Sequence, residues 1–171
     1  FLYSIREKPE YQKIIQMIQR MAPFFQDFIL RTMKNNESLI KLEGKHKGSD
    51  AYFDANSLSD GTLRFILLTT LLMQPELPSV ILLDEPELGL HPYAMQLLGA
   101  MLRSAAAKTQ VIVSTQSVTL TNEFSPEDII IVEQKDGSSS FQRLKEEDVK
   151  IWLDDYKMGD LWEKNLIGGT P

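Results

Sequence analysis

The chain has 171 residues, 43% of them hydrophobic, which is enough for one domain with a buried core. Its formal net charge of −6 argues against a protein that wraps nucleic acid with a basic surface along its whole length. Because the chain has no cysteine, a disulfide framework and a thiolate metal site are excluded. The sequence contains neither an apolar run of the roughly 18 residues that a membrane span needs nor a signal segment, so we expect a cytoplasmic protein with no membrane partner.

The first part of the sequence predicts a helix and a β-hairpin. Apolar residues recur at helical spacing over Pro9–Met21, and proline suits the first turn of a helix. Residues 24–33 are ambiguous between a short helix and a strand. Residues 38–44 and 50–55 alternate as strands do, on either side of a turn. We therefore expect residues 1–56 to lead into a larger lobe.

The central region, residues 57–144, alternates helices with apolar strands. A largely buried helix is predicted from Thr62 to Met73. Val80–Leu83 is a continuous apolar run, as in parallel strands that are covered on both faces. After a helix from Pro92 to about Ala106, residues 109–117 repeat the pattern of a buried strand with a polar tip. This order implies a parallel sheet with crossover helices.

The last part of the sequence predicts a second hairpin followed by two short helices. Residues 128–134 and 140–144 flank a turn that contains glycine, which is typical of a β-hairpin. Short helices are expected at residues 146–155 and 159–166. We assign residues 145–171 to the same domain as the central region.

Four polar segments occur in one order along the central region. Leu58–Thr62 opens a helix, and Asp84 and Glu85 end an apolar strand. Glu87–Pro92 forms the loop after these acids, and Ser114–Ser117 lies at the tip of the next strand. Each segment is common by itself, but ligands of open parallel sheets bind beyond the carboxyl ends of the strands. The order and spacing together therefore indicate a ligand site.

The residue types in these segments fit phosphate chemistry. Asp84 suits Mg²⁺ held through its water shell, because Mg²⁺ prefers hard oxygen ligands and keeps several waters. Glu85 can orient or deprotonate an attacking water. The helix start at Ser59–Thr62 presents free N–H groups and positive potential to an anion.

These motifs resemble the C-terminal half of the nucleotide-binding domain of ABC-type ATPases, particularly the SMC/RecF/OLD-like branch of bacterial AAA-family ATPases. Leu58–Thr62 is similar to the ABC signature, and Val80–Glu85 is similar to Walker B. Glu87–Pro92 resembles the D-loop, and Thr115–Ser117 resembles the switch. The resemblance implies an α/β fold: a P-loop NTPase half-domain with a mainly parallel sheet, crossover helices and a terminal β-hairpin.

The resemblance also implies a composite site in a head-to-tail homodimer that binds ATP and Mg²⁺. In this family, ATP bound by Walker A of one subunit is capped by the signature motif of the other. Asp84 would then hold Mg²⁺ through water, while Glu85 and Gln116 would be catalytic at the chain's own ATP. The residues implied at the γ-phosphate of the partner's ATP are Ser59, Asp60, Gly61 and Thr62. Those implied along the dimer seam are Gly89, Leu90 and His91.

The sequence departs from the family pattern at Walker A. That motif needs Gly-x-x-x-x-Gly-Lys followed by Ser or Thr. Gly44-Lys45 is followed by His46, so it is not a P-loop. We expect an N-terminal Walker A lobe in the same polypeptide, without which this fragment is inactive alone.

Two further departures affect the chemistry. The family generally has histidine at the switch, whereas Gln116 can donate a hydrogen bond but cannot become cationic, so hydrolysis is slow or the residue only senses ATP. Asp60 replaces a signature glycine and is expected to cap N–H groups locally. Arg64 could lean toward phosphate or a D-loop acid, or be a surface arginine. His91 is expected to anchor a helix start.

Three functions remain open from the sequence. The first is an ATP-driven dimerising switch in DNA repair, DNA metabolism or phage defence, with DNA as a possible partner. The second is an ABC transporter subunit, disfavoured because Gln116 and the signature differ from that pattern. The third is a non-hydrolysing interaction module, which Gln116 favours and the intact Asp84-Glu85 pair opposes. Basal hydrolysis and its response to DNA would separate them.

Overall fold

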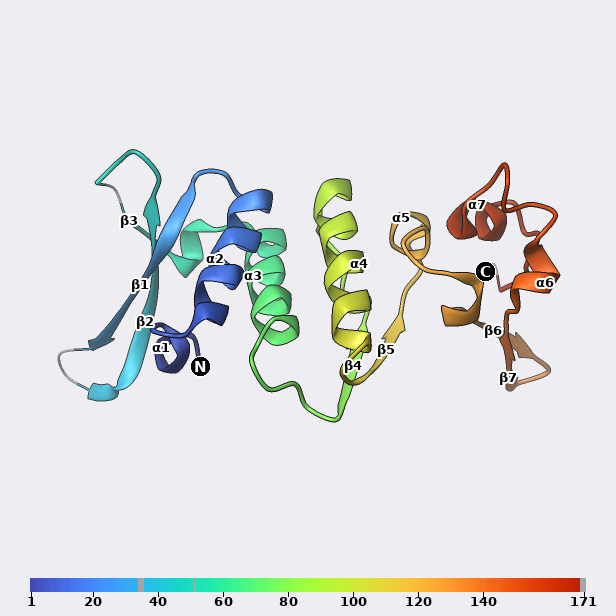
Figure 1. Ribbon diagram of the computed structural model, residues 1–171, viewed down its shortest axis with the longest axis horizontal. Helices are drawn as coiled ribbons and strands as arrows, with labels where there is room; N and C mark the ends of the chain where they lie inside the picture. Colours follow the sequence, from blue (N-terminus) through green and yellow to red (C-terminus); the bar gives the residue numbers. More distant parts are fainter. Residues whose placement is uncertain (34–35, 51, 170–171) are drawn as a thin grey trace.

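A computed structural model describes residues 1–33, 36–50 and 52–169 of the chain. Figure 1 shows the elements following one another along the long axis of the molecule. A three-stranded antiparallel sheet lies at one end, helices and a parallel strand pair occupy the middle, and the terminal hairpin lies at the other end. In the described ranges, no helix has both the length and the apolar character needed to cross a membrane.

The N-terminal region is a helix packed on an antiparallel sheet. The predicted helix is confirmed with its bounds, and of the ambiguous residues 24–33 all but Phe24 form a strand. The predicted hairpin is also confirmed, although Ala51 lies outside the described residues. Burial of Ile14 and Ile18 against Phe25 joins the helix to the sheet. The elements are α1 (Leu2–Ile5), α2 (Pro9–Met21), β1 (Phe25–Met33), β2 (Asn36–His46) and β3 (Tyr52–Asp54).

The next helix begins two residues before its predicted start. The short 3-10 helix η1 (Ala55–Ser57) leads into α3 (Asp60–Leu72). The Ser59 side chain accepts a hydrogen bond from the Thr62 backbone N–H at 3.2 Å, as an N-cap does. The cap therefore draws Asp60 and Gly61 into the first turn.

A strand–helix–strand unit forms the centre of the molecule. It consists of β4 (Val80–Asp84), α4 (Pro92–Ala106) and β5 (Gln110–Ser114). The two strands are parallel and in register, which confirms the α/β class and the crossover helix. Within the described ranges, parallel pairing is confined to this strand pair, since the other two sheets are antiparallel.

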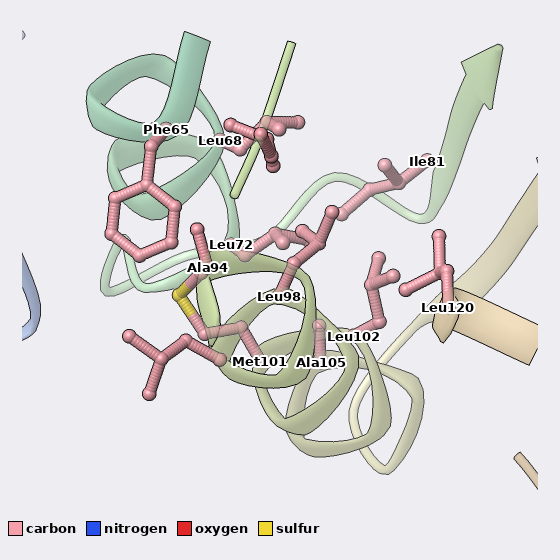
Figure 2. Close-up of a cluster of buried hydrophobic side chains, with 12 residues drawn as sticks. Phe65, Leu68, Leu72, Ile81, Ala94, Leu98, Met101, Leu102, Ala105 and Leu120 are labelled. Carbon is pink, nitrogen blue, oxygen red and sulfur yellow. The ribbon is translucent and has the colours of Figure 1, made fainter. Parts of the chain in front are cut away.

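The central core lies on one face of this strand pair. In Figure 2, side chains from α3 and α4 pack together with Ile81 of β4 and Leu120 of α5 (Val118–Thr121). The opposite face, which we call the outer face, consists of Val80, Leu82 and Ile112. Their exposed fractions are 45%, 70% and 49%. The prediction that both strands are buried on both faces was therefore wrong for this chain, because helices cover only one face.

The C-terminal region is a hairpin with two short helices. The hairpin is confirmed, but the first predicted helix is much shorter than expected. The chain continues as turns after Val149, and the first turn is closed by a hydrogen bond from Trp152 N–H to the Val149 carbonyl at 2.8 Å. Trp162 Nε1 donates to the Gly169 carbonyl at 3.0 Å and fastens the tail. The elements are η2 (Pro126–Asp128), β6 (Ile130–Lys135), β7 (Ser138–Arg143), α6 (Glu146–Val149) and α7 (Met158–Glu163).

Candidate functional site

The acidic end of β4 lies beside the polar end of β5. Asp84 is paired in register with Ser114, and the Ser114 hydroxyl donates a hydrogen bond to Asp84 Oδ1. The Glu85 backbone N–H donates to the Ser114 carbonyl at 2.9 Å. The carboxyl ends of the two strands thus meet at one edge, as the sequence predicted. The sequence placed Ser114 in the polar tip of this strand but gave it no individual role.

Glu85 has an unusual backbone conformation. Its φ angle is +42°, in the left-handed region that residues other than glycine seldom adopt. Arg64 Nη1 on α3 donates to the Glu85 carbonyl at 3.1 Å. Arg64 therefore contacts the end of the Walker B-like segment rather than a D-loop acid. Such local strain is common at functional sites and costs about 1 to 3 kcal/mol.

The signature-like helix start has a defined set of backbone donors. The Thr62 N–H is used by the Ser59 cap, and the Ser59 and Thr62 hydroxyls lie 2.9 Å apart. The N–H groups of Asp60 and Gly61 belong to the first turn, where an α-helix offers no internal acceptor. Asp60 is exposed, and the cap is made by Ser59 rather than by Asp60 as the sequence had led us to expect.

The signature-like loop touches the D-loop through two glycines. A Cβ atom built on Gly61 would collide with the Gly89 carbonyl oxygen, so only glycine fits at this approach. Gly89 itself has φ +75°, a conformation that glycine adopts without strain. The structure therefore brings together two segments that the sequence placed 28 residues apart, counting from 61 to 89.

The rest of the D-loop is fixed by short-range hydrogen bonds. The Leu90 N–H donates to the Glu87 carbonyl at 2.9 Å, and the Leu90 side chain is buried. His91 Nδ1 accepts from the Tyr93 N–H at 3.3 Å and caps α4, so the prediction that His91 anchors a helix start is confirmed. Gly89 and His91 remain exposed at the surface.

The switch-like segment is tied to the D-loop by a contact that the sequence did not indicate. Thr115 Oγ1 donates to Glu87 Oε1, and it also accepts from the Ser117 N–H at 3.0 Å. Gln116 lies between these two held residues and is exposed. The change from apolar to polar residues at the end of β5 predicted where the switch-like segment lies, but it did not predict the hydrogen bond to Glu87.

The described residues offer one carboxylate suited to Mg²⁺ and no phosphate loop for the nucleotide. Within the described ranges, no group of three or more His, Cys, Asp or Glu side chains could hold a metal ion. Asp84 is an exposed carboxylate at the strand end, and Mg²⁺ is commonly held by one or two carboxylates together with waters and phosphates. Gly44-Lys45 lies inside β2, where a Cβ on Gly44 would strike the Phe53 ring, so it forms no phosphate loop.

The fold is that of the P-loop NTPases, and solved structures of SMC ATPases and SMC heads share it. One comes from work on ATP-driven dimerization and DNA-stimulated activation of SMC ATPases, with TM-score 0.61, 17% identity, and coverage of 90% of this chain and 94% of that chain. Another is an SMC head bound to the C-winged helix domain of ScpA, with TM-score 0.67, 17% identity, and coverage of 83% and 44%. A third is the SMC head from Pyrococcus furiosus with an extended coiled coil, bound to the C-terminal domain of ScpA, with TM-score 0.66, 18% identity, and coverage of 85% and 37%.

The family follows from the sequence match. Residues 5–122, more than half of the chain, match the family described as AAA domain, putative AbiEii toxin, Type IV TA system. The chain belongs to this family. A comparison with curated proteins found no match. The chain spans 44% and 37% of the lengths of the two ScpA-bound SMC heads.

Proposed function

We propose that this chain is the C-terminal lobe of an ATP-driven dimerising switch in the cytoplasm. The observation that carries the proposal is the contact of Gly61 with Gly89. It joins a helix N-terminus suited to phosphate directly to the loop that follows the acidic strand end. One surface of the chain can therefore serve two phosphate sites, its own through the strand end and a partner's through the helix start.

The strand end serves the chain's own ATP. Asp84 would hold Mg²⁺ through water, and the hydrogen bond from Ser114 fixes one of the Asp84 carboxylate oxygens. Mg²⁺, when bound, neutralises charge on the transferring phosphate. Glu85 orients and deprotonates the attacking water, and Arg64 holds its backbone. Gln116 donates a hydrogen bond toward the γ-phosphate and supplies no positive charge, so hydrolysis is slow.

The helix start serves the ATP of a second copy. Donors from Asp60 and Gly61, with the Ser59 and Thr62 hydroxyls, cap the γ-phosphate of that ATP. The D-loop residues Gly89, Leu90 and His91 line the seam of the homodimer. Because the composite site needs two copies, ATP drives their association.

We further propose that a Walker A lobe lies N-terminal to this chain in the same polypeptide. The outer face of β4 and β5 supports this proposal, since parallel strands are ordinarily covered on both faces. Added cover over Val80, Leu82 and Ile112 would complete the sheet. A Walker A lobe there would bring its phosphate loop to the same edge as Asp84.

The biological setting that we propose is DNA repair, DNA metabolism or phage defence. The words printed for one similar structure concern DNA-stimulated activation of SMC ATPases, and the family description names a toxin–antitoxin system. Those words concern the relatives and motivate a test of DNA stimulation. A second candidate is a non-hydrolysing interaction module, which the uncharged Gln116 favours. An ABC transporter subunit is a weaker alternative.

The decisive experiment uses the intact polypeptide with a Glu85→Gln substitution, because this change slows hydrolysis and preserves the bound state. Its mass in solution is measured with and without Mg-ATP. We expect a monomer that becomes a dimer only with Mg-ATP, and we expect Ser59→Arg to abolish the change. Ser104→Arg, on the exposed side of α4, is the matched control and should still dimerise.

The outcomes separate the candidate functions. An ATP-dependent dimer of the Glu85→Gln protein, together with hydrolysis by the unsubstituted polypeptide that DNA accelerates, supports the switch in DNA metabolism. An ATP-dependent dimer with no DNA response keeps the switch and removes the DNA assignment. A mass that is the same with and without Mg-ATP rules out the switch and favours the interaction module.

A further inference from the structure

We propose that Glu87 and Thr115 form a positioning pair that couples the D-loop to Gln116. This inference rests on the proposed function, because it deepens the role given there to Gln116 and to the dimer seam. Neither Glu87 nor Thr115 was given an individual role from the sequence. The pair is proposed from its contacts and burial.

The first observation is the burial of a carboxylate. Glu87 is only 6% exposed, although acidic residues are rarely buried without partners. Its Oε1 accepts the Thr115 hydroxyl, whereas its Oε2 is buried with no hydrogen-bond partner in the described part of the chain. Burying a polar group that is incompletely paired costs free energy. A buried carboxylate with one unpaired oxygen fits a positioning role better than a stabilising one.

The second observation is that Thr115 is held from both sides. Its hydroxyl donates to Glu87 and accepts the Ser117 N–H at 3.0 Å. The Ser117 hydroxyl in turn accepts from the Leu120 N–H at 3.2 Å and lies 3.6 Å from Met95 Sδ on α4. Both neighbours of Gln116 are therefore fixed, which sets the direction in which Gln116 leaves the strand tip.

The third observation connects this pair to the dimer seam. The Glu87 carbonyl accepts the Leu90 N–H, which forms the tight turn that presents Gly89. Gly89 contacts Gly61 of the signature-like loop. A displacement of the D-loop during dimer closure would therefore move Glu87, and Glu87 would carry it to Thr115. Closure and the placement of Gln116 would be coupled through a single hydrogen bond.

The first test measures ATP hydrolysis by the intact polypeptide. Thr115→Val keeps the shape of the side chain and removes its hydroxyl. We expect kcat to fall about tenfold while KM for ATP stays within about twofold, because a misplaced catalytic group slows the reaction without weakening ground-state binding. Thr115→Ser restores the hydroxyl and should restore kcat. Thr109→Val is the matched control, because the Thr109 hydroxyl donates to the Pro78 carbonyl at the opposite end of β5.

The second test measures hydrogen exchange of the same proteins without nucleotide, so it does not depend on ATPase activity. The backbone amides of residues 116 and 117 should exchange about tenfold faster in both Thr115→Val and Glu87→Ala. The double variant should exchange no faster than Thr115→Val alone, because valine at position 115 already removes the hydrogen bond to Glu87. If Glu87→Ala does not fold, Thr115→Val against Thr115→Ser carries the comparison.

The two tests distinguish failure of the coupling from failure of the proposed function. Unchanged exchange at residues 116 and 117 in Thr115→Val overturns the positioning pair. So does an unchanged kcat in Thr115→Val when Gln116→Ala lowers it. If the wild-type polypeptide neither hydrolyses ATP nor dimerises, the proposed function fails. The exchange experiment then still decides whether Glu87 and Thr115 hold the switch segment.

Discussion

The two main sheets of the molecule are covered in different ways. In the antiparallel sheet, α2 packs Ile14 and Ile18 against Phe25 on one face, and the strands expose much of the other. In the parallel pair, α3 and α4 cover the inner face, yet the outer face presents Leu82 with 70% of its surface exposed. The first sheet has a pattern matched to one-sided cover, whereas the second is apolar on both sides.

This difference teaches that the pattern of apolar and polar residues along a strand indicates how many of its faces are suited to burial. An antiparallel sheet with one solvated face ordinarily alternates apolar and polar residues. A continuous apolar run, as at Val80–Leu83, fits two-sided cover even where only one face is packed. The apolar outer face is therefore the sharpest structural support for a partner lobe.

The largest expected effect contrasts the two faces of β4. Ile81 is 3% exposed on the inner face, so Ile81→Ala should lower the unfolding free energy by about 2 to 5 kcal/mol. In the 171-residue chain, Leu82→Ala should change it by less than about 0.5 kcal/mol. Urea unfolding of both variants checks this. In the intact polypeptide, Leu82→Ala should become as costly as Ile81→Ala, and an unchanged small effect there would argue against a lobe on the outer face.

The next effect tests the contact between the signature-like loop and the D-loop. Gly61→Ala places a methyl group against the Gly89 carbonyl, so we expect a loss of about 1 to 3 kcal/mol. Without that contact, alanine would stabilise the helix by up to about 1 kcal/mol relative to glycine. The sign of the change in thermal unfolding therefore decides whether the two loops touch. Asp60→Ala, one position earlier and exposed, is the control and should have a small effect.

A smaller effect belongs to the antiparallel sheet. Tyr11 on α2 donates to Asp27 Oδ1 on β1 at 2.7 Å, and burial, followed by this hydrogen bond, raises the pKa of Tyr11. Tyr11→Phe should cost about 1.5 kcal/mol, typical of a hydrogen bond to a charged group. Because the folded state keeps the phenol protonated, the contribution of Tyr11 is fully present below pH 10 and decreases as pH rises above it.

The pH dependence offers its own control. Unfolding free energy of the wild type should fall between pH 10 and pH 11 more steeply than that of Tyr11→Phe. Tyr93→Phe, at a tyrosine with 48% of its surface exposed, should retain the wild-type slope. Equal slopes in the wild type and Tyr11→Phe would show that the phenol does not join α2 to the sheet.

Much of the fold could be predicted because its elements have regular patterns. Helix α2 repeats apolar residues at helical spacing, and its bounds were predicted without error. Strand β1 was ambiguous because a register shift between Phe25 and Asp27 interrupts its alternation. The helix predicted over residues 146–155 shortened to α6, since the turns after Val149 depend on tertiary packing that no local pattern records.

The contacts of the candidate site likewise include some that the sequence predicts and some that it does not. The meeting of Asp84 with Ser114 follows from strand order, because parallel strands in register bring their ends together. The bonds from Arg64 to Glu85 and from Thr115 to Glu87 join residues 21 and 28 positions apart on different elements. Nothing in the spacing of those residues specifies such pairs.

The left-handed backbone at Glu85 has a consequence for how this sequence can change. Glycine would relieve the local strain there, whereas glutamine would retain it. A Glu85→Gly variant should therefore fold more stably while lacking the carboxylate, and Glu85→Gln should lack it without that gain. At position 85, the substitution that raises thermal stability would therefore be one that removes the carboxylate needed for activity. A lineage under selection for heat resistance alone would be expected to lose the acid first.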